Sequence, residues 1–227
     1  MNNFILPNLY AHRGLHNAKI PENSIQSLDN AYNNFFTAIE FDIWLNENSL
    51  IICHNRPKKS TESSYPSLKN FLKYQNHFHY WLDFKNIDLE NINQILDLVN
   101  NDLKTSKIDL QKIIFAPYIN DYDLALKILA KFKNHFGEKN CNFALICDET
   151  SNINEVERVF AENEVDFLSI YHQLITPELL QKIAPEKILT WTVNEEKILQ
   201  NLCNLGVKNF ATDKILPKNL LNYTIST

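Results

Sequence analysis

Two acidic residues stand two positions apart in the apolar run IEFDIW, residues 39–44. If this run is a β-strand, Glu40 and Asp42 project from one face and their apolar neighbours from the other, because side chains alternate along a strand. Two carboxylates directed into a protein interior need a cation or hydrogen-bond donors to stay ionised. Carboxylate oxygens are ligands that suit Mg²⁺ or Ca²⁺. The spacing therefore predicts a divalent-cation site, and two acids on a solvated edge strand are the alternative.

The run WLDFK, residues 81–85, repeats this arrangement. Asp83 and Lys85 would share one face of a strand, since they are also two positions apart. Asp83 could supply a third oxygen ligand to the cation, and Lys85 a fixed positive charge for a phosphate oxygen. The same pattern on its own often forms only an ion pair.

Two histidines extend this chemistry. His12 follows the run NLYA, and His54 ends the apolar run IIC. Taken alone, His54 could be a surface residue. As a pair, two imidazoles near neutral pH can take a proton from one group and give a proton to another, which is what cleavage of a phosphodiester requires.

The segment PENS, residues 21–24, has the features of a helix start. Asn23 fits an N-cap, and Gln26 three residues later would complete a capping box. Glu22 has no clear role in this pattern.

These residues need a scaffold that brings them together. Strand-like runs alternate with apolar residues at helical spacing, which indicates parallel strands joined by helices. The predicted strands are residues 8–14, 37–44, 80–85, 113–118, 141–147, 166–171, 188–193 and 209–213, with a hairpin strand at 49–55. Eight such strands are the number in a (β/α)₈ TIM barrel, and an open doubly wound sheet is the competing architecture.

The positions of the polar residues favour the barrel. Seven of them lie at or near the carboxyl ends of predicted strands: His12, Glu40, Asp42, Asp83, Lys85, Trp191 and Asp213. In a (β/α)₈ barrel these ends converge on one face, where the active site is built. The barrel would turn seven scattered positions into one cluster.

Composition excludes several other classes. The chain has 227 residues, 44% of them hydrophobic, which predicts one globular domain over 1–227. The net charge is −5 and no basic run could follow a phosphate backbone, so nucleic acid is not an expected partner. We expect no secretory signal and no transmembrane segment. The four cysteines lack CxxC spacing and indicate reduced thiols in a cytoplasmic protein.

In order along the chain, the motifs resemble those of the glycerophosphodiester phosphodiesterases, a family related to the phosphatidylinositol phospholipase C barrels. The matching segments are HRG at 12–14, PENS at 21–24, IEFDIWLNENSLIICHN at 39–55, YPSLKNFL at 65–72, LDFK at 82–85, WTVN at 191–194 and ATD at 211–213. The resemblance implies acid and base roles for His12 and His54, and binding of a divalent cation, Mg²⁺ or Ca²⁺, by Glu40, Asp42 and Asp83. It also implies phosphate binding by Arg13 and Lys85, a pocket lined by Trp191, and a glycine at position 14 that lets the chain turn tightly.

The resemblance implies hydrolysis of a glycerophosphodiester, or of a related lipid-derived or glycan-linked phosphodiester, to a phosphomonoester and an alcohol. The sequence departs from the family pattern at Asp83, which is usually Glu, at Asn55, which is usually Asp, and in the hairpin turn NENS, which lacks the usual glycine. It also lacks the small inserted domain after the second histidine.

The missing insertion predicts an open mouth and a preference for bulkier substrates. The three departures at Asp83, Asn55 and the hairpin turn keep open a non-catalytic barrel that binds phosphate or metal. Asp83 and Lys85 together with the missing insertion keep open a sphingomyelinase D-like phospholipase. The oligomeric state does not follow from the sequence.

Overall fold

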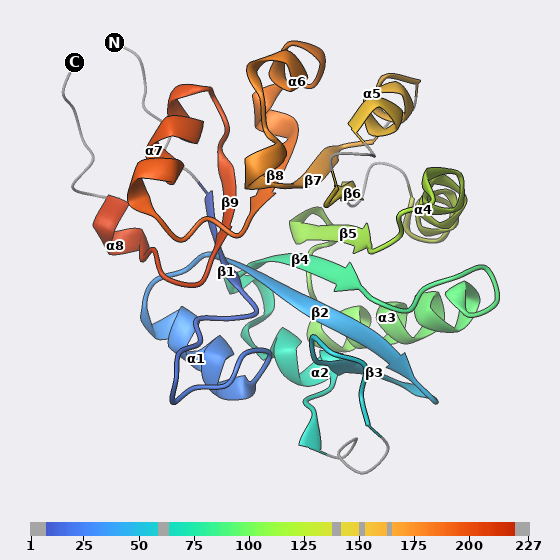
Figure 1. Cartoon of the computed structure of the whole chain (residues 1–227). Helices are drawn as coiled ribbons and strands as arrows, with labels where there is room; N and C mark the ends of the chain where they lie inside the picture. The colour runs from blue at the N-terminus through green and yellow to red at the C-terminus, as the bar shows by residue number, and fades with distance from the viewer. Residues whose placement is uncertain (1–7, 59–63, 138–141, 150–152, 163–164, 221–227) are drawn as a thin grey trace.

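Eight parallel strands form a closed barrel (Figure 1). The computed structural model describes residues 8–58, 64–137, 142–149, 153–162 and 165–220. Strand β1 pairs with both β2 and β9, which closes the sheet, so the predicted (β/α)₈ barrel is confirmed and the open doubly wound sheet is excluded. The barrel strands are β1 (Asn8–His12), β2 (Ala38–Asn46), β4 (His79–Phe84), β5 (Ile113–Pro117), β6 (Asn142–Cys147), β7 (Phe167–Tyr171), β8 (Ile188–Trp191) and β9 (Asn209–Thr212).

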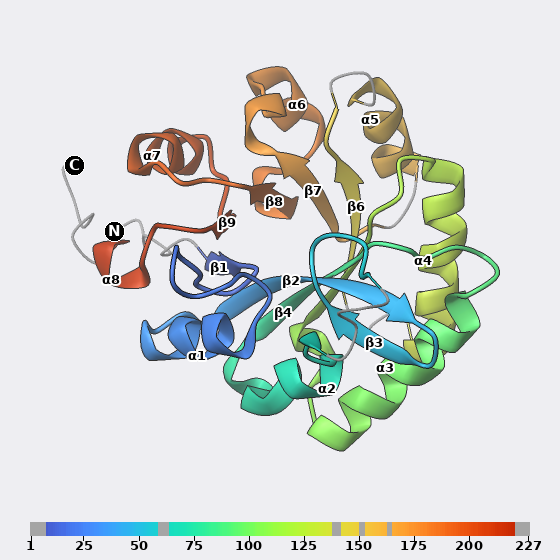
Figure 2. The same ribbon diagram turned by 60° about the horizontal axis from the view of Figure 1, so that its bottom comes forward.

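Helices surround the strands (Figure 2). They are α1 (Ile25–Asn33), α2 (Leu68–Phe71), α3 (Ile92–Ser106), α4 (Tyr122–Phe136), α5 (Ile153–Glu162), α6 (Pro177–Lys182), α7 (Glu196–Asn204) and α8 (Pro217–Leu220). Short 3₁₀ turns are η2 (Leu72–His77), η3 (Leu110–Lys112), η5 (His172–Leu174) and η6 (Pro185–Lys187). Among the described helices, none is both long enough and apolar enough to cross a bilayer.

The larger hydrophobic core lies between the strands and the helices. Ile39, Phe41 and Ile43 of β2 are fully buried in it, as the alternation of the sequence predicts. A second, smaller cluster fills the barrel interior, where Tyr10 meets Trp81 edge to face with ring centroids 5.7 Å apart. Most other members of this cluster are alanines and aliphatic residues, so the barrel below the polar residues is packed rather than hollow.

Strand β3 (Ser49–Ile52) is antiparallel to the end of β2 and forms the predicted hairpin. The turn between them has no glycine, and Glu47 itself takes the left-handed conformation with φ 48°. The hairpin carries the chain from Asp42 to His54.

The predicted cap of helix α1 is wrong by one residue. Ser24, not Asn23, is the N-cap: its hydroxyl accepts the Ser27 N–H at 3.0 Å, and the Ser27 hydroxyl accepts the Ser24 N–H at 3.2 Å. A capping residue needs an extended backbone, which Ser24 has, whereas Asn23 has a positive φ of 53°. The Asn23 side chain is therefore free to contact another part of the chain.

The described cysteines carry free thiols. Cys53 and Cys147 are buried and Cys203 is partly exposed. Cys141 lies outside the described residues.

Candidate active site

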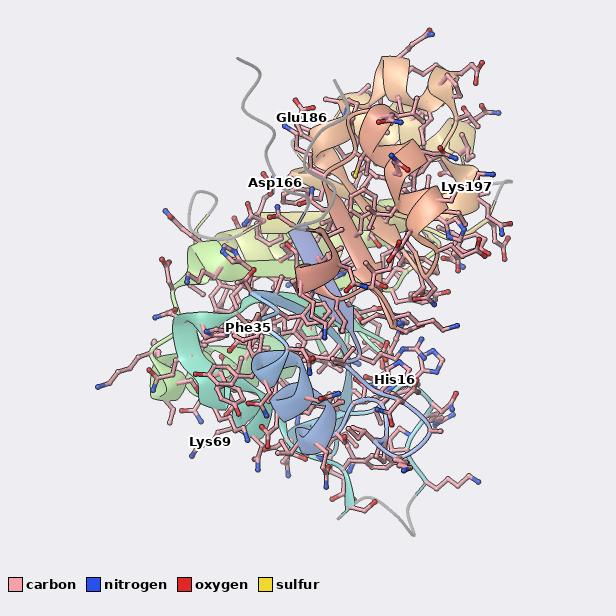
Figure 3. The ribbon with its side chains drawn as sticks, turned by 90° about the vertical axis from the view of Figure 1, so that its left-hand side faces the viewer. His16, Phe35, Lys69, Asp166, Glu186 and Lys197 are labelled. Atoms are coloured by element: carbon pink, nitrogen blue, oxygen red, sulfur yellow. The ribbon has the colours of Figure 1, made fainter. Side chains whose placement is uncertain are left out.

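A pocket of about 370 Å³ opens at the carboxyl ends of the barrel strands. All eight residues predicted to do chemistry lie in its wall, although their positions span 180 residues of sequence, from His12 to Trp191. The lining residues are His12, Arg13, Glu40, Asp42, Trp44, His54, Trp81, Asp83, Lys85, Tyr118, Ile146, Ser169 and Trp191. Figure 3 shows His16, in the segment after β1, on the opposite side of the molecule from Phe35 and Asp166, which precede strands β2 and β7.

Three carboxylates meet at one side of this pocket. Strands β2 and β4 are neighbours in parallel register, with Asp42 opposite Asp83. One oxygen each from Glu40, Asp42 and Asp83 lies within 4.8 Å of the other two. This spacing could hold one divalent cation.

Two cationic side chains bind the same acids. The Lys85 ammonium lies 2.5 Å from Asp83 Oδ2 and 2.9 Å from Asp42 Oδ1. Arg13 Nε lies 3.2 Å from Asp42 Oδ2, Arg13 Nη1 donates to Glu22 at 3.0 Å, and the Arg13 backbone N–H donates to Glu40 Oε2 at 3.0 Å. Arg13 holds this position with a positive φ of 54°. Glu22, to which the sequence pattern gave no clear role, is thus a partner of Arg13.

Burial affects the three acids differently. Burial by itself would raise the pKa of Asp42, but Lys85 and Arg13 outweigh it and lower the pKa, so Asp42 is ionised. Burial raises the pKa of Asp83 to about 6 despite Lys85, and burial together with the two neighbouring acids raises the pKa of Glu40 well above its ordinary value. The positive charge around Glu40 and Asp83 is therefore too small to offset the effect of burial on their pKa values.

This charge shortage fits a bound cation. Asp83 Oδ1 is buried without a hydrogen-bond partner, although a carboxylate oxygen can accept two hydrogen bonds. An oxygen ligand of this kind, beside two further carboxylates, matches the donor set of Mg²⁺ or Ca²⁺.

His12 has a defined orientation. Its Nδ1 lies 2.7 Å from Asp213 Oδ1. Hydrogen bonds from His12 and His16 outweigh the burial of Asp213 and lower its pKa, so this carboxylate is ionised and can only accept. Nδ1 of His12 must then carry the proton, so in the neutral ring Nε2 has a free lone pair. Nε2 lies 3.8 Å from Glu40 Oε2 and therefore faces the carboxylate side of the pocket.

Asp213 is held in turn by Asn194. The Asn194 amide donates to Asp213 Oδ2 at 2.8 Å, and its oxygen accepts the Asp213 N–H at 2.8 Å. His16 Nε2 also donates to Asp213 Oδ1, at 3.0 Å. Sequence reasoning placed Asp213 at a strand end but missed Asn194 and His16; the only signals were the last residue of WTVN and a histidine four positions after His12.

His54 follows β3, and burial lowers the pKa of its imidazole, which favours the neutral form. Its carbonyl accepts a hydrogen bond from the Trp44 indole at 3.3 Å. Trp44 is another pocket residue that sequence reasoning missed, although it follows Glu40 and Asp42 at the same two-residue spacing.

The half of the pocket built by β5–β8 is uncharged. Tyr118, Ile146, Ser169 and Trp191 line it. The Trp191 indole donates to the Ser169 hydroxyl at 2.9 Å, which fixes the plane of the indole ring. The Tyr118 ring lies 4.5 Å from the Lys85 ammonium and so joins the two halves.

Comparison with known proteins gives structural likeness only. No protein-family model matches the sequence, and no curated protein sequence matches it. Among solved structures, a phosphodiesterase from Oleispira antarctica in complex with its product sn-glycerol-3-phosphate is similar, with a TM-score of 0.72, 16% identity, and 96% of each chain covered. A glycerophosphodiester phosphodiesterase from Parabacteroides distasonis gives 0.69 and 19%, over 96% of this chain and 97% of that one.

A calcium-dependent phosphoinositol-specific phospholipase C from a Pseudomonas species is also similar. Its TM-score is 0.55 at 12% identity, over 91% of this chain and 90% of that one. At these identities the likenesses establish a shared barrel fold.

Proposed function

We propose that this chain is a metal-dependent phosphodiesterase that hydrolyses a glycerophosphodiester, or a related lipid-derived or glycan-linked phosphodiester, to a phosphomonoester and an alcohol. One observation carries the proposal: a single pocket collects three carboxylates, two cationic side chains and two imidazoles. The fold shared with the Oleispira and Parabacteroides phosphodiesterases supports it.

Glu40, Asp42 and Asp83 would hold Mg²⁺ or Ca²⁺, which when bound neutralises a phosphoryl oxygen and makes a nearby hydroxyl more acidic. Lys85 and Arg13 would stabilise the negative charge that grows on the phosphoryl oxygens. Asp42 already orients the side chains of Lys85 and Arg13, so these two side chains need little reorganisation when substrate binds.

His12 and His54 would divide proton transfer between them. One imidazole takes the proton of the attacking water as its oxygen bonds to phosphorus, and the other gives a proton to the alcohol as its bond to phosphorus breaks. The hydrogen bond to Asp213 places the His12 proton on Nδ1 and leaves Nε2 able to accept one. Whichever imidazole serves as the acid must first take up a proton from solvent, and burial makes this less favourable for His54 because it lowers the pKa of that imidazole.

The proposal is tested by turnover of an aryl phosphodiester with Mg²⁺ or Ca²⁺ present. We expect no turnover in excess chelator and full recovery with added cation. His12→Ala and His54→Ala should each lower kcat by roughly 10²–10⁴. His135→Ala is the matched control, because His135 lies on α4 and packs edge to face against Phe136 outside the pocket.

Full activity in a preparation shown to be metal-free would refute the role of the cation. Unchanged turnover in His12→Ala or His54→Ala would refute the acid–base assignment. Complete absence of turnover, together with calorimetric binding of Mg²⁺ or inorganic phosphate, would instead establish a non-catalytic binding barrel.

The substrate is proposed to be bulkier than a simple glycerophosphodiester. Between β3 and β4 the described chain contains only the short elements α2 and η2, whereas an inserted domain would overhang the pocket. The mouth would then be bounded by loops over residues 55–67, 117–123 and 171–177, of which 59–63 lie outside the described residues. A larger alcohol could reach these loops and use their surface for positioning.

A size series tests this proposal. We expect kcat/KM to rise from glycerophosphocholine to a lysolipid or a phosphodiester-linked glycan. A wide preference for the smallest compound would exclude the open-mouth argument while leaving the phosphodiesterase assignment intact.

A further inference from the structure

Asp213 lies between two histidines, of which His12 lines the pocket. These three residues form a second group of potential ligands in addition to the three carboxylates. We propose that His12 Nδ1, His16 Nε2 and Asp213 Oδ1 bind a transition-metal ion of the zinc type. We further propose that occupancy of this site inhibits the phosphodiesterase; that consequence rests on the proposed function.

The three donor atoms already converge. His12 Nδ1 and His16 Nε2 lie 2.7 Å and 3.0 Å from the same oxygen of Asp213, and all three atoms lie within 4.8 Å of one another. Ligands about 2.0–2.1 Å from a tetrahedral zinc ion stand about 3.3 Å apart, so each imidazole nitrogen needs to move away from Asp213 Oδ1 by only a few tenths of an ångström. The side chains are 13%, 23% and 22% exposed, which lets an ion reach them from solvent.

The carboxylate of this group is prearranged. Asn194 binds both the Asp213 side chain, through Oδ2, and the Asp213 backbone, which leaves Oδ1 directed at the two imidazoles. Two imidazole nitrogens and one carboxylate oxygen are the donor types of three-ligand zinc sites that keep a fourth position open. The cluster of Glu40, Asp42 and Asp83 offers only oxygens, which suit Mg²⁺ or Ca²⁺. We therefore expect zinc to bind the group of His12, His16 and Asp213, and magnesium to bind the three carboxylates.

Occupancy would change the tautomer of His12. In the structure Nδ1 carries the proton, because it donates to Asp213. A metal ion on Nδ1 requires the lone pair of that nitrogen, so the proton moves through solvent to Nε2 and the ring stays neutral. Nε2 then points a proton, rather than a lone pair, toward the pocket. His12 can no longer accept a proton there, and it could give up the Nε2 proton only by becoming an imidazolate anion. It would therefore serve neither as base nor as acid in the proposed reaction.

Direct binding tests the site without any use of turnover. Calorimetry with Zn²⁺ and the visible absorption of bound Co²⁺ are measured on wild type, His16→Ala, Asp83→Asn and His135→Ala. We expect His16→Ala to weaken Zn²⁺ binding by at least about tenfold. Asp83→Asn and His135→Ala should bind Zn²⁺ as wild type does, because neither residue belongs to the proposed site. Unchanged affinity in His16→Ala, or affinity lost in Asp83→Asn instead, would overturn the site.

Inhibition is then measured with the aryl phosphodiester at saturating Mg²⁺. Zn²⁺ should inhibit wild type. Measured relative to its own rate without Zn²⁺, His16→Ala should need at least about tenfold more Zn²⁺ for the same fractional inhibition. Equal sensitivity of His16→Ala and wild type would overturn the inhibitory role. If the chain has no turnover at all, the proposed function fails while the binding data still decide the site.

Discussion

Replacing Asn23 by alanine should destabilise the fold and disturb the pocket at the same time. Asn23 is only 4% exposed, and its amide donates to Asp42 Oδ2 at 2.7 Å. Its oxygen accepts the Asp42 N–H at the longer distance of 3.3 Å. Asn23 also holds a left-handed backbone, which asparagine tolerates better than alanine.

The expected loss follows from these contacts. A hydrogen bond to a charged group contributes about 1.5–3 kcal/mol, and the longer neutral bond about 0.5 kcal/mol. Alanine at a left-handed position costs about 1 kcal/mol. Lys85 and Arg13 still compensate the Asp42 charge in the variant, so we take the lower end of the first range and expect a loss of about 3 kcal/mol in the free energy of unfolding. Glycine removes the backbone strain, so Asn23→Gly should be about 1 kcal/mol more stable than Asn23→Ala.

Urea unfolding in the presence of chelator measures both variants against wild type, since chelator removes any stabilisation by a bound cation. Ser24→Ala is the matched control, because it should cost only the N-cap, about 1 kcal/mol, and leave Asp42 in place. In the activity assay Asn23→Ala should need more cation for half-maximal rate, whereas Ser24→Ala should not. A stability loss below about 0.5 kcal/mol in Asn23→Ala would show that Asn23 does not support Asp42, and would refute this reasoning.

Three further predictions concern single residues. Asp83→Glu should retain activity or change the preferred metal, whereas Asp83→Ala should lose affinity for the activating cation; calorimetry with Mg²⁺ and Ca²⁺ checks both, and equal affinity in Asp83→Ala would exclude Asp83 as a ligand. Gly14→Ala should lose roughly 2–4 kcal/mol in urea unfolding, because φ is +74° and the added Cβ would collide with the Ser27 hydroxyl and lie 2.8 Å from the Ser27 carbonyl carbon; a loss under 1 kcal/mol would contradict this packing. Burial raises the pKa of Cys53 to about 12, so its thiol should resist alkylation in the native state at pH 8 and react once unfolded. Because the folded state keeps this proton and the unfolded state loses it near pH 8.5, the Cys53 contribution makes stability fall as pH rises above that value, and Cys53→Ala should flatten the fall.

The barrel was predictable because its signal repeats along the chain. Each inward-facing polar residue sits among apolar neighbours that face the helices, as Glu40 and Asp42 do between Ile39, Phe41 and Ile43. This alternation gives the orientation of every side chain on a strand without any knowledge of its partners. Strand order and closure then bring those side chains to one end of the barrel.

Contacts made by loop residues could not be predicted in this way. Asn23 and Ser24 are both good capping residues, and sequence alone does not tell which one takes the extended backbone that a cap needs. The choice depends on Asp42, 19 residues away, which binds the Asn23 amide. His16 contacts Asp213 from 197 residues away and Asn194 contacts it from 19 residues away, so no local pattern marks either residue.

The register between β2 and β4 links the fold to the charge balance of the pocket. Asp42 pairs with Asp83 across these parallel strands, and Lys85 lies one alternation beyond Asp83, so its ammonium reaches both acids. A slip of one residue in β2 would turn Glu40 and Asp42 toward the helices and place Phe41 at the pocket. Buried carboxylates among helix-facing apolar residues would be strongly unfavourable, so the hydrophobic core itself enforces the register.

In that register Lys85 and Arg13 keep Asp42 ionised, while the pKa values of Glu40 and Asp83 stay raised. The same core packing that stabilises the barrel thus leaves two carboxylates short of positive charge, and a divalent cation is the ligand that would supply it.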